Sequence, residues 1–163
     1  MLKYEKAVNI TKLVTLSSLI WHEYWKEFLS DEQIDYMIEK FQSENAIKNQ
    51  IENENYEYYY IYYNRDMIGY IGLANKDEYL FLSKFYLKKE CRHKGIGTKT
   101  FQFIKEYART QEKNRIVLTV NKENKNSIEA YKKWGFIVTN AVVTDIGNGF
   151  VMDDYVMEYK CNF

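Results

Sequence analysis

Proline is absent from this sequence of 163 residues, and cysteine and histidine occur only twice each. The two cysteines, Cys91 and Cys161, form no CxxC pair, so neither a disulfide framework nor a zinc ribbon is indicated, and we expect no metal site. No run of about 18 apolar residues is present to span a bilayer. The start, MLKYEKAVNITK, lacks the basic-then-apolar pattern of a secretory signal. We therefore expect a soluble cytoplasmic protein with no membrane partner.

The apolar content of 46% is enough for one buried core, and we expect a single domain over residues 1–163. The net charge is zero but unevenly distributed. Residues 1–80 hold 8 Lys and Arg against 14 Asp and Glu, whereas residues 81–163 hold 15 against 9. The segment Glu23–Glu57, with ten acidic and three basic residues, could attract a cationic substrate or simply present solvated helix faces. The basic C-terminal half suits a polyanionic ligand.

Helical patterns dominate the first third of the chain. Apolar residues recur at helical spacing from Asn9, a candidate N-cap, to about Phe28. Ser30 and Gln33 form a capping box that opens a second helix, Asp31 to about Phe41, and Ser43 is placed to cap a third that ends near Ile51. The acidic segment is therefore predicted to be mostly helical.

Strand patterns begin with the tyrosine-rich run YEYYYIYY. The later elements are predicted as strands at 56–63, 67–74, 79–87 and 115–120, helices at 97–110 and 127–134, and two strands around Gly147-Asn148-Gly149. Stacked tyrosines could bind a single-stranded nucleic acid, but the acidic flanks favour cross-strand packing, so we expect no nucleic-acid partner. Alternating helices and strands predict an α/β fold with a mixed central sheet flanked by helices.

The basic stretch KKECRHKGIGTKTF, residues 88–101, places two glycines before a predicted helix. Glycine reaches backbone angles at which N–H groups converge, and a helix start adds its positive dipole end, so the turn is suited to an anion such as phosphate. A nucleotide P-loop is excluded because Thr98 stands where lysine is needed. A dinucleotide fingerprint is excluded because position 100 is threonine, not glycine.

Two motifs in order, over roughly residues 79–137, resemble the GNAT superfamily of acyl-CoA-dependent N-acetyltransferases. The first motif, Arg/Gln-x-x-Gly-x-Gly/Ala, is matched by Arg92, Gly95 and Gly97. The second is matched by Asn124, Tyr131, Gly135 and Phe136. More loosely, GNGFVMDDYVMEY and NKNSIEAYKKWGF are similar to the spermidine/spermine, or polyamine, acetyltransferase branch.

The resemblance implies a GNAT-like domain that binds acetyl-CoA where a parallel strand pair splays apart. Its pantetheine would pair with the main chain of Phe85, Tyr86 and Leu87, and with the side chain of Asn124. Its pyrophosphate would take the N–H groups from about His93 to Thr98, namely those of His93, Lys94, Gly95, Ile96, Gly97 and Thr98. The side chains of Arg92 and Lys94 would add positive charge.

The implied reaction is acetyl transfer to the primary amine of a small cationic acceptor by direct attack in a ternary complex. Tyr131 matches the family's proton donor to the leaving thiolate, although it could also be a core residue beside Trp134. No general base is identified. The candidates for the base or for acceptor recognition are Glu23, Glu27, Asp153 and Asp154, and Trp21 either lines the acceptor pocket or packs in the core.

Two alternatives stay open at this point. The acceptor could instead be a peptide N-terminus or a protein lysine, and the domain could be a non-catalytic acyl-CoA-binding module. A homodimer is also an open alternative to a monomer.

Overall fold

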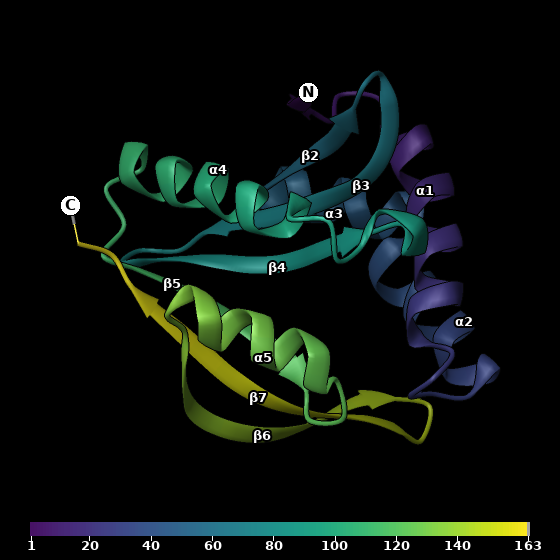
Figure 1. The fold of residues 1–163 in the computed structure, drawn as a ribbon. Coiled ribbons are helices and arrows are strands. Elements are labelled where there is room, and N and C mark those ends of the chain that lie inside the picture. The colour runs from purple at the N-terminus through teal and green to yellow at the C-terminus, as the bar shows by residue number, and fades with distance from the viewer. Residues whose placement is uncertain (163) are drawn as a thin grey trace. The chain divides into compact units, whose positions relative to one another are not determined.

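The computed structural model describes residues 1–162. Within them the chain forms the elements drawn in Figure 1: β1 (Leu2–Lys6), α1 (Ile10–Trp25), α2 (Asp31–Gln42), α3 (Glu44–Asn53), β2 (Tyr56–Tyr63), β3 (Asp66–Asn75), β4 (Tyr79–Leu87), a 3-10 turn (Lys89–Cys91), α4 (Ile96–Thr110), β5 (Arg115–Asn121), α5 (Lys125–Trp134), β6 (Ile137–Gly147) and β7 (Phe150–Lys160). The strand order is β1-β2-β3-β4-β5-β7-β6. The predicted mixed α/β sheet is confirmed, because β4 and β5 pair in parallel and β5 and β7 pair antiparallel.

The chain divides into two compact units. The first unit comprises Met1–Ala74 and Ser83–Gly97, and the second comprises Asn75–Leu82 and Thr98–Phe163. Within the second unit, parallel pairing joins Tyr79–Phe81 to Arg115–Val117, and both strands continue beyond these pairs. Whether β4 and β5 splay apart stays a prediction, as does a single domain over residues 1–163.

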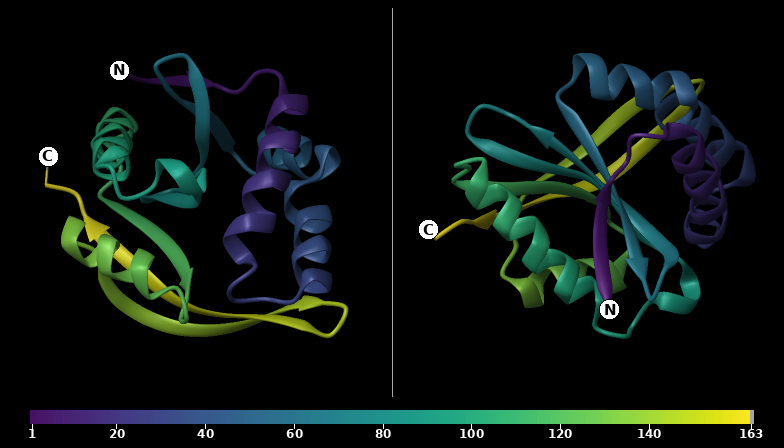
Figure 2. Two further views of the ribbon diagram at one scale, coloured as in Figure 1. Left: turned by 45° about the vertical axis from the view of Figure 1, so that its right-hand side comes forward. Right: turned by 90° about the horizontal axis from the view of Figure 1, so that it is seen from above.

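The three helices of the first unit start where their capping residues predicted. The side chains of Asn9, Ser30 and Ser43 each accept a hydrogen bond from a backbone N–H in the first turn of α1, α2 and α3. Figures 1 and 2 show α1 and α2 side by side. The first helix ends at Trp25, whereas the apolar pattern suggested Phe28, because the last apolar residues pack from a turn that follows the helix.

The hairpin of β2 and β3 confirms the predicted role of the tyrosine run. Asn64 and Arg65 form its turn at φ values of 49° and 76°, and Asp66 already pairs with Tyr63 as the first residue of β3. Tyr58 and Tyr60, which alternate along β2, are 1% and 3% exposed. Their rings therefore belong to the core of the first unit, where a nucleic acid could not stack on them.

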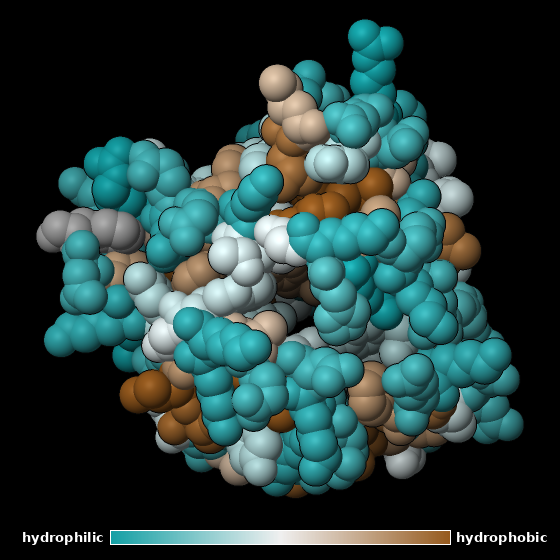
Figure 3. Space-filling model, viewed as in Figure 1, coloured by the Kyte–Doolittle hydropathy of each residue, from teal (hydrophilic) through white to brown (hydrophobic). Residues whose placement is uncertain are grey.

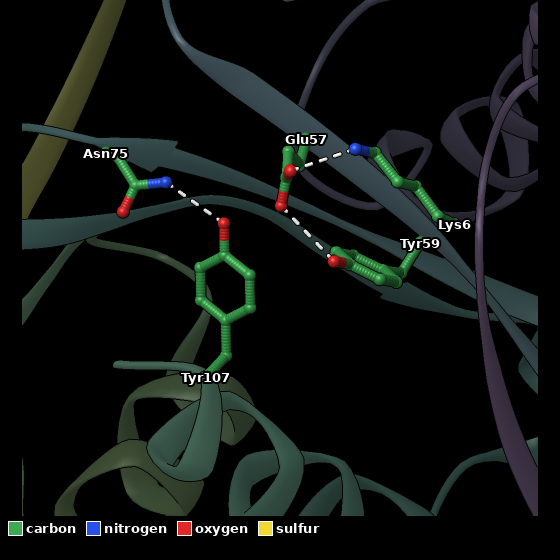
Figure 4. A network of polar contacts seen from close by, with 5 residues as sticks. All are labelled: Lys6, Glu57, Tyr59, Asn75 and Tyr107. Atoms are coloured by element: carbon green, nitrogen blue, oxygen red, sulfur yellow. Dashed lines mark hydrogen bonds and ion pairs between the residues drawn. The ribbon is translucent and has the colours of Figure 1, made fainter. Parts of the chain in front are cut away.

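Sequence patterns missed β1, a strand of five residues at the edge of the sheet. Leu2 and Tyr4 alternate with the exposed Lys3 and Glu5, but this alternation is too short to predict a strand, so only pairing with β2 defines it. Figure 4 shows that Lys6 of β1 reaches Glu57 of β2, with 3.0 Å between Nζ and Oε1, and that Tyr59 donates to the same carboxylate. In the second unit, Asn75 Nδ2 donates to the Tyr107 hydroxyl at 3.0 Å (Figure 4).

Aromatic side chains make the core of the second unit. Phe101 of α4 stacks on Trp134 of α5 with 5.1 Å between ring centroids, and it meets Tyr159 of β7 edge-on. Figures 1 and 2 show α5 lying along β7. Gly135 ends α5 at φ 106°, a left-handed cap that favours glycine, and this explains the Gly-Phe pair of the second motif.

The exposed surface is mostly hydrophilic on the face drawn in Figure 3, in keeping with a mean hydropathy of −0.54. Exposed large apolar side chains gather on the β6–β7 hairpin, namely Ile137, Val138, Val143 and Val151. None of the helices in the described part of the chain is long and apolar enough to cross a membrane.

Candidate active site

The basic loop of the first unit has the backbone geometry of an anion site. His93 and Gly95 both have positive φ, at 61° and 78°, directly before α4. His93, Lys94 and Gly95 are exposed, and a Cβ added to Gly95 would meet no described atom within 4 Å. The first turn of α4, all of it within the described residues, carries no acidic side chain. An anion placed there would meet open space and the positive end of a helix of 15 residues.

Only one of the two loop glycines adopts the backbone conformation that the sequence pattern predicted for both. Gly95 has the positive φ that the turn requires, whereas Gly97 lies inside α4 and is absent from the positive-φ residues. Its neighbour Ile96 is 6% exposed and anchors the start of the helix. Conformational freedom is therefore needed at Gly95, while Gly97 can serve only by its small size.

The side chain of Arg92 is held inward by the first unit itself. Its Nε donates to the Leu87 carbonyl at 3.0 Å, its guanidinium lies 5.0 Å from the centroid of the Tyr24 ring, and Nη2 lies 4.0 Å from Glu23 Oε1. Glu23 Oε1 also accepts a hydrogen bond from the Lys89 N–H at 2.9 Å. These contacts make Glu23 and Arg92 a clamp that fixes the loop to α1. The sequence pattern alone did not indicate this pairing.

Trp21 lies in the buried interior of the first unit. It is 2% exposed, its indole N–H donates to the Tyr70 hydroxyl at 2.7 Å, and its ring lies 5.6 Å from that of Tyr86. The Tyr70 hydroxyl donates in turn to Gln42, whose side chain reaches Tyr58. This network favours the packing interpretation of Trp21. Glu27 is exposed in the turn that follows α1.

Some main-chain groups at the end of β4 already form hydrogen bonds within the protein. The Leu87 carbonyl accepts from Arg92, and the N–H of Lys88 donates to the Ile68 carbonyl at 2.7 Å. A Cβ on Gly69 would lie 2.2 Å from the Tyr86 carbonyl oxygen, so glycine is required there for β3 and β4 to approach. Phe85, Tyr86 and Leu87 are half-buried, and their pairing with pantetheine stays a prediction.

The second unit carries Asn124 and Tyr131 on one helix. Asn124 is 5% exposed and caps α5, where its side chain accepts from the Ser127 N–H at 3.4 Å. Tyr131 is half-buried, and its ring meets Trp134 and Phe136, each with 5.6 Å between centroids. Trp134 also donates to the Thr98 hydroxyl at 3.2 Å. Packing therefore fixes the Tyr131 ring, which leaves its proposed chemistry to its hydroxyl.

The adjacent carboxylates Asp153 and Asp154 on β7 differ in solvent exposure and in their polar partners. Asp153 is exposed and forms an ion pair with Lys122, with 2.8 Å between Oδ1 and Nζ. Asp154 is 6% exposed, and its Oδ1 is buried without a hydrogen-bond partner among residues 1–162. Burial, with a smaller contribution from Asp153, raises the pKa of the Asp154 carboxyl to about 6.

Sequence reasoning overlooked Asn121, which stands directly across from Asp154 as the last residue of β5. Asn121 is 9% exposed and its side chain accepts from the Glu123 N–H at 2.9 Å. A buried polar residue at a strand end was the available signal. Within the described range, 1–162, no three His, Cys, Asp or Glu side chains gather closely enough to hold a metal ion.

A mixed sheet with a parallel strand pair, a loop with the backbone geometry of an anion site that opens a helix, and a capped helix that carries a tyrosine are the features expected of an acyl-CoA-dependent enzyme of the α/β class. A model described as the acetyltransferase (GNAT) family matches residues 18–136. The chain therefore belongs to the acetyltransferase (GNAT) family and is an acetyl-CoA-dependent N-acetyltransferase.

Individual relatives are distant in sequence and similar in fold. An uncharacterized N-acetyltransferase in the pepI 3' region of Lactobacillus delbrueckii subsp. lactis is 26% identical over 135 residues, which cover 78% of each chain. The PaiA N-acetyltransferase of Thermoplasma acidophilum, solved in complex with coenzyme A, superposes with a TM-score of 0.80 at 21% identity, covering 98% of this chain and 99% of that one. A GCN5-related N-acetyltransferase from Rhodopseudomonas palustris superposes with a TM-score of 0.79 at 12% identity, covering 97% of this chain and 94% of that one.

Proposed function

We propose that the protein acetylates a primary amine of a small cationic acceptor, with a polyamine such as spermidine as the first candidate. One observation carries this proposal. Of the ten acidic residues in Glu23–Glu57, eight are exposed, namely Glu27, Asp31, Glu32, Asp35, Glu39, Glu44, Glu52 and Glu54. A surface of one sign raises the local concentration of ligands of the opposite sign and speeds their association. The first unit therefore favours acceptors that carry more than one positive charge.

The loop of the first unit is proposed to hold the pyrophosphate of acetyl-CoA. The exposed loop, with two residues at positive φ before α4, offers main-chain N–H groups, and Lys94 adds an exposed positive charge. Arg92 contributes less directly, because its side chain braces the loop against Leu87 and Glu23. The similar Thermoplasma acidophilum protein binds coenzyme A, which supports this assignment.

The helix α5 is proposed to serve the thioester end. Bound acetyl-CoA supplies an activated acetyl group, and the departing sulfur needs a proton. The hydroxyl of Tyr131 is suited to give that proton, because its ring is fixed by Trp134 and Phe136. Asn124 holds the start of α5 through its cap and presents an amide suited to the pantetheine arm.

An amine panel tests the proposed acceptor. Release of free coenzyme A thiol is followed with spermidine, shorter diamines, a monoamine, an aminoglycoside and a peptide with a free N-terminus. We expect the highest kcat/KM for the polyamines. A preference for the peptide would move the assignment to a protein acetyltransferase, and equal rates for monoamine and polyamine would contradict the charge argument.

Salt dependence and a charge variant sharpen the same test. The kcat/KM for spermidine is expected to fall as salt rises, because screening weakens long-range attraction. The double variant Glu32→Gln, Glu39→Gln removes two exposed charges from α2 and should flatten that dependence. The matched control, Glu112→Gln with Glu129→Gln, removes two exposed charges from the second unit and should leave the slope unchanged.

A further inference from the structure

One buried carboxylate of the second unit has an oxygen without a partner among the described residues. Asp154 is only 6% exposed, and its Oδ1 has no hydrogen-bond partner among residues 1–162. A buried anion that lacks a partner is destabilising, so proteins seldom keep one without a use. The preceding residue shows the usual arrangement, because Asp153 is exposed and paired with Lys122. The orphaned oxygen is therefore an acceptor that a donor from a ligand can satisfy.

The strand register places Asp154 at the carboxyl end of β5. Its cross-strand neighbours are Asn121 on β5 and Val142 on β6. Asn121 ends β5, and Asn124, three residues later, is the N-cap of α5. Ligands of open α/β sheets bind at the carboxyl ends of parallel strands, and β5 is the parallel partner of β4. Asp154 thus lies at the carboxyl end of β5, which is the end of the strands where such folds bind their ligands.

The charged groups around Asp154 in the described chain do not neutralise it. Its own strand contributes Asp153, which raises its pKa, and the loop after β5 contributes Lys122, which lowers it but is already paired with Asp153. The cross-strand neighbours Asn121 and Val142 carry no charge. Burial is the largest influence and brings the pKa of Asp154 to about 6. A carboxylate with a pKa near the working pH is suited to accept and release a proton.

We propose that Asp154 is the residue that receives the acceptor's ammonium and takes its proton. This inference rests on the proposed function and identifies the general base that its chemistry requires. The acceptor nitrogen gives one proton to the Asp154 carboxylate and uses the freed lone pair to form a C–N bond with the acetyl carbon. The C–S bond breaks, and the departing sulfur takes a proton from Tyr131. The second proton of the nitrogen passes through solvent to the Tyr131 phenolate, so the products are a neutral amide, a thiol, a neutral Tyr131 and a protonated Asp154. Proton transfer to Asp154 accompanies the attack because a free alkylammonium has a pKa of about 10.4.

The substitution Asp154→Asn tests the proposal against Asp153→Asn as its matched control. Asp154→Asn keeps the size of the side chain and removes the proton acceptor, so kcat/KM for spermidine should fall about 10²–10⁴-fold while the KM for acetyl-CoA stays unchanged. The acidic limb of the rate profile near pH 6 should disappear. Asp153→Asn should keep most of the activity and an acidic limb that lies at lower pH, because Asp153 raises the pKa of Asp154 and its loss leaves Lys122 without its ion-pair partner. If Asp154→Asn retains kcat/KM within a few-fold, the proposal is overturned.

A binding experiment separates this proposal from the choice of acceptor. Spermidine at about pH 8, where Asp154 is ionised, should raise the melting temperature of the wild-type protein and of Asp153→Asn without acetyl-CoA, and should have no effect on Asp154→Asn. An equal rise in all three proteins would overturn the role of Asp154. If spermidine is not acetylated but another amine of the panel is, the same two measurements are made with that amine, so a wrong acceptor is distinguished from a wrong base.

Chemical rescue guards against a fold defect. Asp154→Ala leaves room for a small carboxylate, and added formate should restore part of the lost kcat at saturating amine. Formate should have no such effect on Tyr131→Phe. Absence of rescue in a variant that melts like the wild type would count against proton transfer to Asp154.

Discussion

Glu23 on α1 and Asp154 on β7 are both acidic candidates for the chemistry, yet their surroundings are opposite. Glu23 accepts a hydrogen bond from the Lys89 N–H and faces Arg92, so its charge is used to build the loop. Asp154 is buried with an oxygen that no described residue satisfies. A charged group whose hydrogen bonds are made within the protein stabilises the structure. A buried charged group with an unsatisfied hydrogen-bond acceptor can instead accept a hydrogen bond from a ligand. The first unit is thus expected to hold the pyrophosphate of acetyl-CoA, and the second is expected to carry the proton transfers.

The sharpest test of that division is Tyr131→Phe in the second unit. The ring contacts with Trp134 and Phe136 are kept, so only the hydroxyl is lost. If Tyr131 gives the proton to the leaving sulfur, kcat should fall about 10²–10⁴-fold with the KM for acetyl-CoA little changed. Tyr155→Phe, on β7 of the same unit, is the matched control and should be near normal. A Tyr131→Phe enzyme within a few-fold of wild type under saturating conditions, with chemistry rate-limiting, would remove Tyr131 from the mechanism.

The complementary change in the first unit is Glu23→Ala. It leaves the Lys89 N–H without its acceptor and frees Arg92, which should weaken acetyl-CoA binding by about 1–2 kcal/mol, or roughly 5–30-fold in Kd. Titration calorimetry measures the change directly. Glu27→Ala, which alters an exposed carboxylate of the turn after α1, should bind acetyl-CoA normally. A fall in kcat with unchanged Kd would mean that Glu23, and not Asp154, belongs to the chemistry.

Stability against pH separates the two carboxylates without any assay of activity. The pKa of Asp154 rises from an ordinary value of 3.8 to about 6 on folding, so between these pH values the folded protein holds more protons than the unfolded chain. The free energy of unfolding therefore falls as pH rises through this window. Relative to Asp154→Asn, the wild type should lose about 1–2 kcal/mol between roughly pH 4 and pH 7, after allowance for solvent screening. Parallel urea curves for the two proteins across this range would contradict the buried, unpaired state of Asp154.

The smallest expected effect on acetyl-CoA binding is that of Gly95→Ala in the loop. Its Cβ meets no described atom within 4 Å, so the cost comes from the backbone alone, at φ 78°. A left-handed alanine is destabilising by about 1–2 kcal/mol, and part of this should appear as weaker acetyl-CoA binding. Thermal melts and calorimetry on the same samples distinguish the two. No change in either would show that the loop does not need this conformation.

Local sequence patterns predicted the helices and strands well where a side chain caps or a period repeats. Asn9, Ser30 and Ser43 marked three helix starts correctly, and the Gly147-Asn148-Gly149 turn marked the β6–β7 hairpin. The five residues of β1 escaped because an edge strand is defined by its partner, which no local pattern records.

The motifs of the site could be predicted from the sequence, but the positions and contacts of their side chains could not. Arg92 matched a motif and was expected to face a phosphate, but its side chain turns to Leu87 and Tyr24, which lie across a turn and far away in the sequence, respectively. The sequence offered no reason to prefer Asp153 or Asp154, because the two are identical residues next to each other. Only the pleat, which points consecutive side chains to opposite faces, leaves one with Lys122 and the other buried.

The hydrogen-bonded burial of Trp21 also has an optical consequence. The chain has three tryptophans, and the first unit contains Trp21 and Trp25, both 5% exposed or less. The third, Trp134, is half-buried on α5 of the second unit. Emission from the first pair should lie to the blue of that from Trp134, because water relaxes the excited indole less in a dry interior. Replacing Trp134 with phenylalanine would make the first unit the sole source of indole fluorescence, so that melting of this unit can be followed by itself.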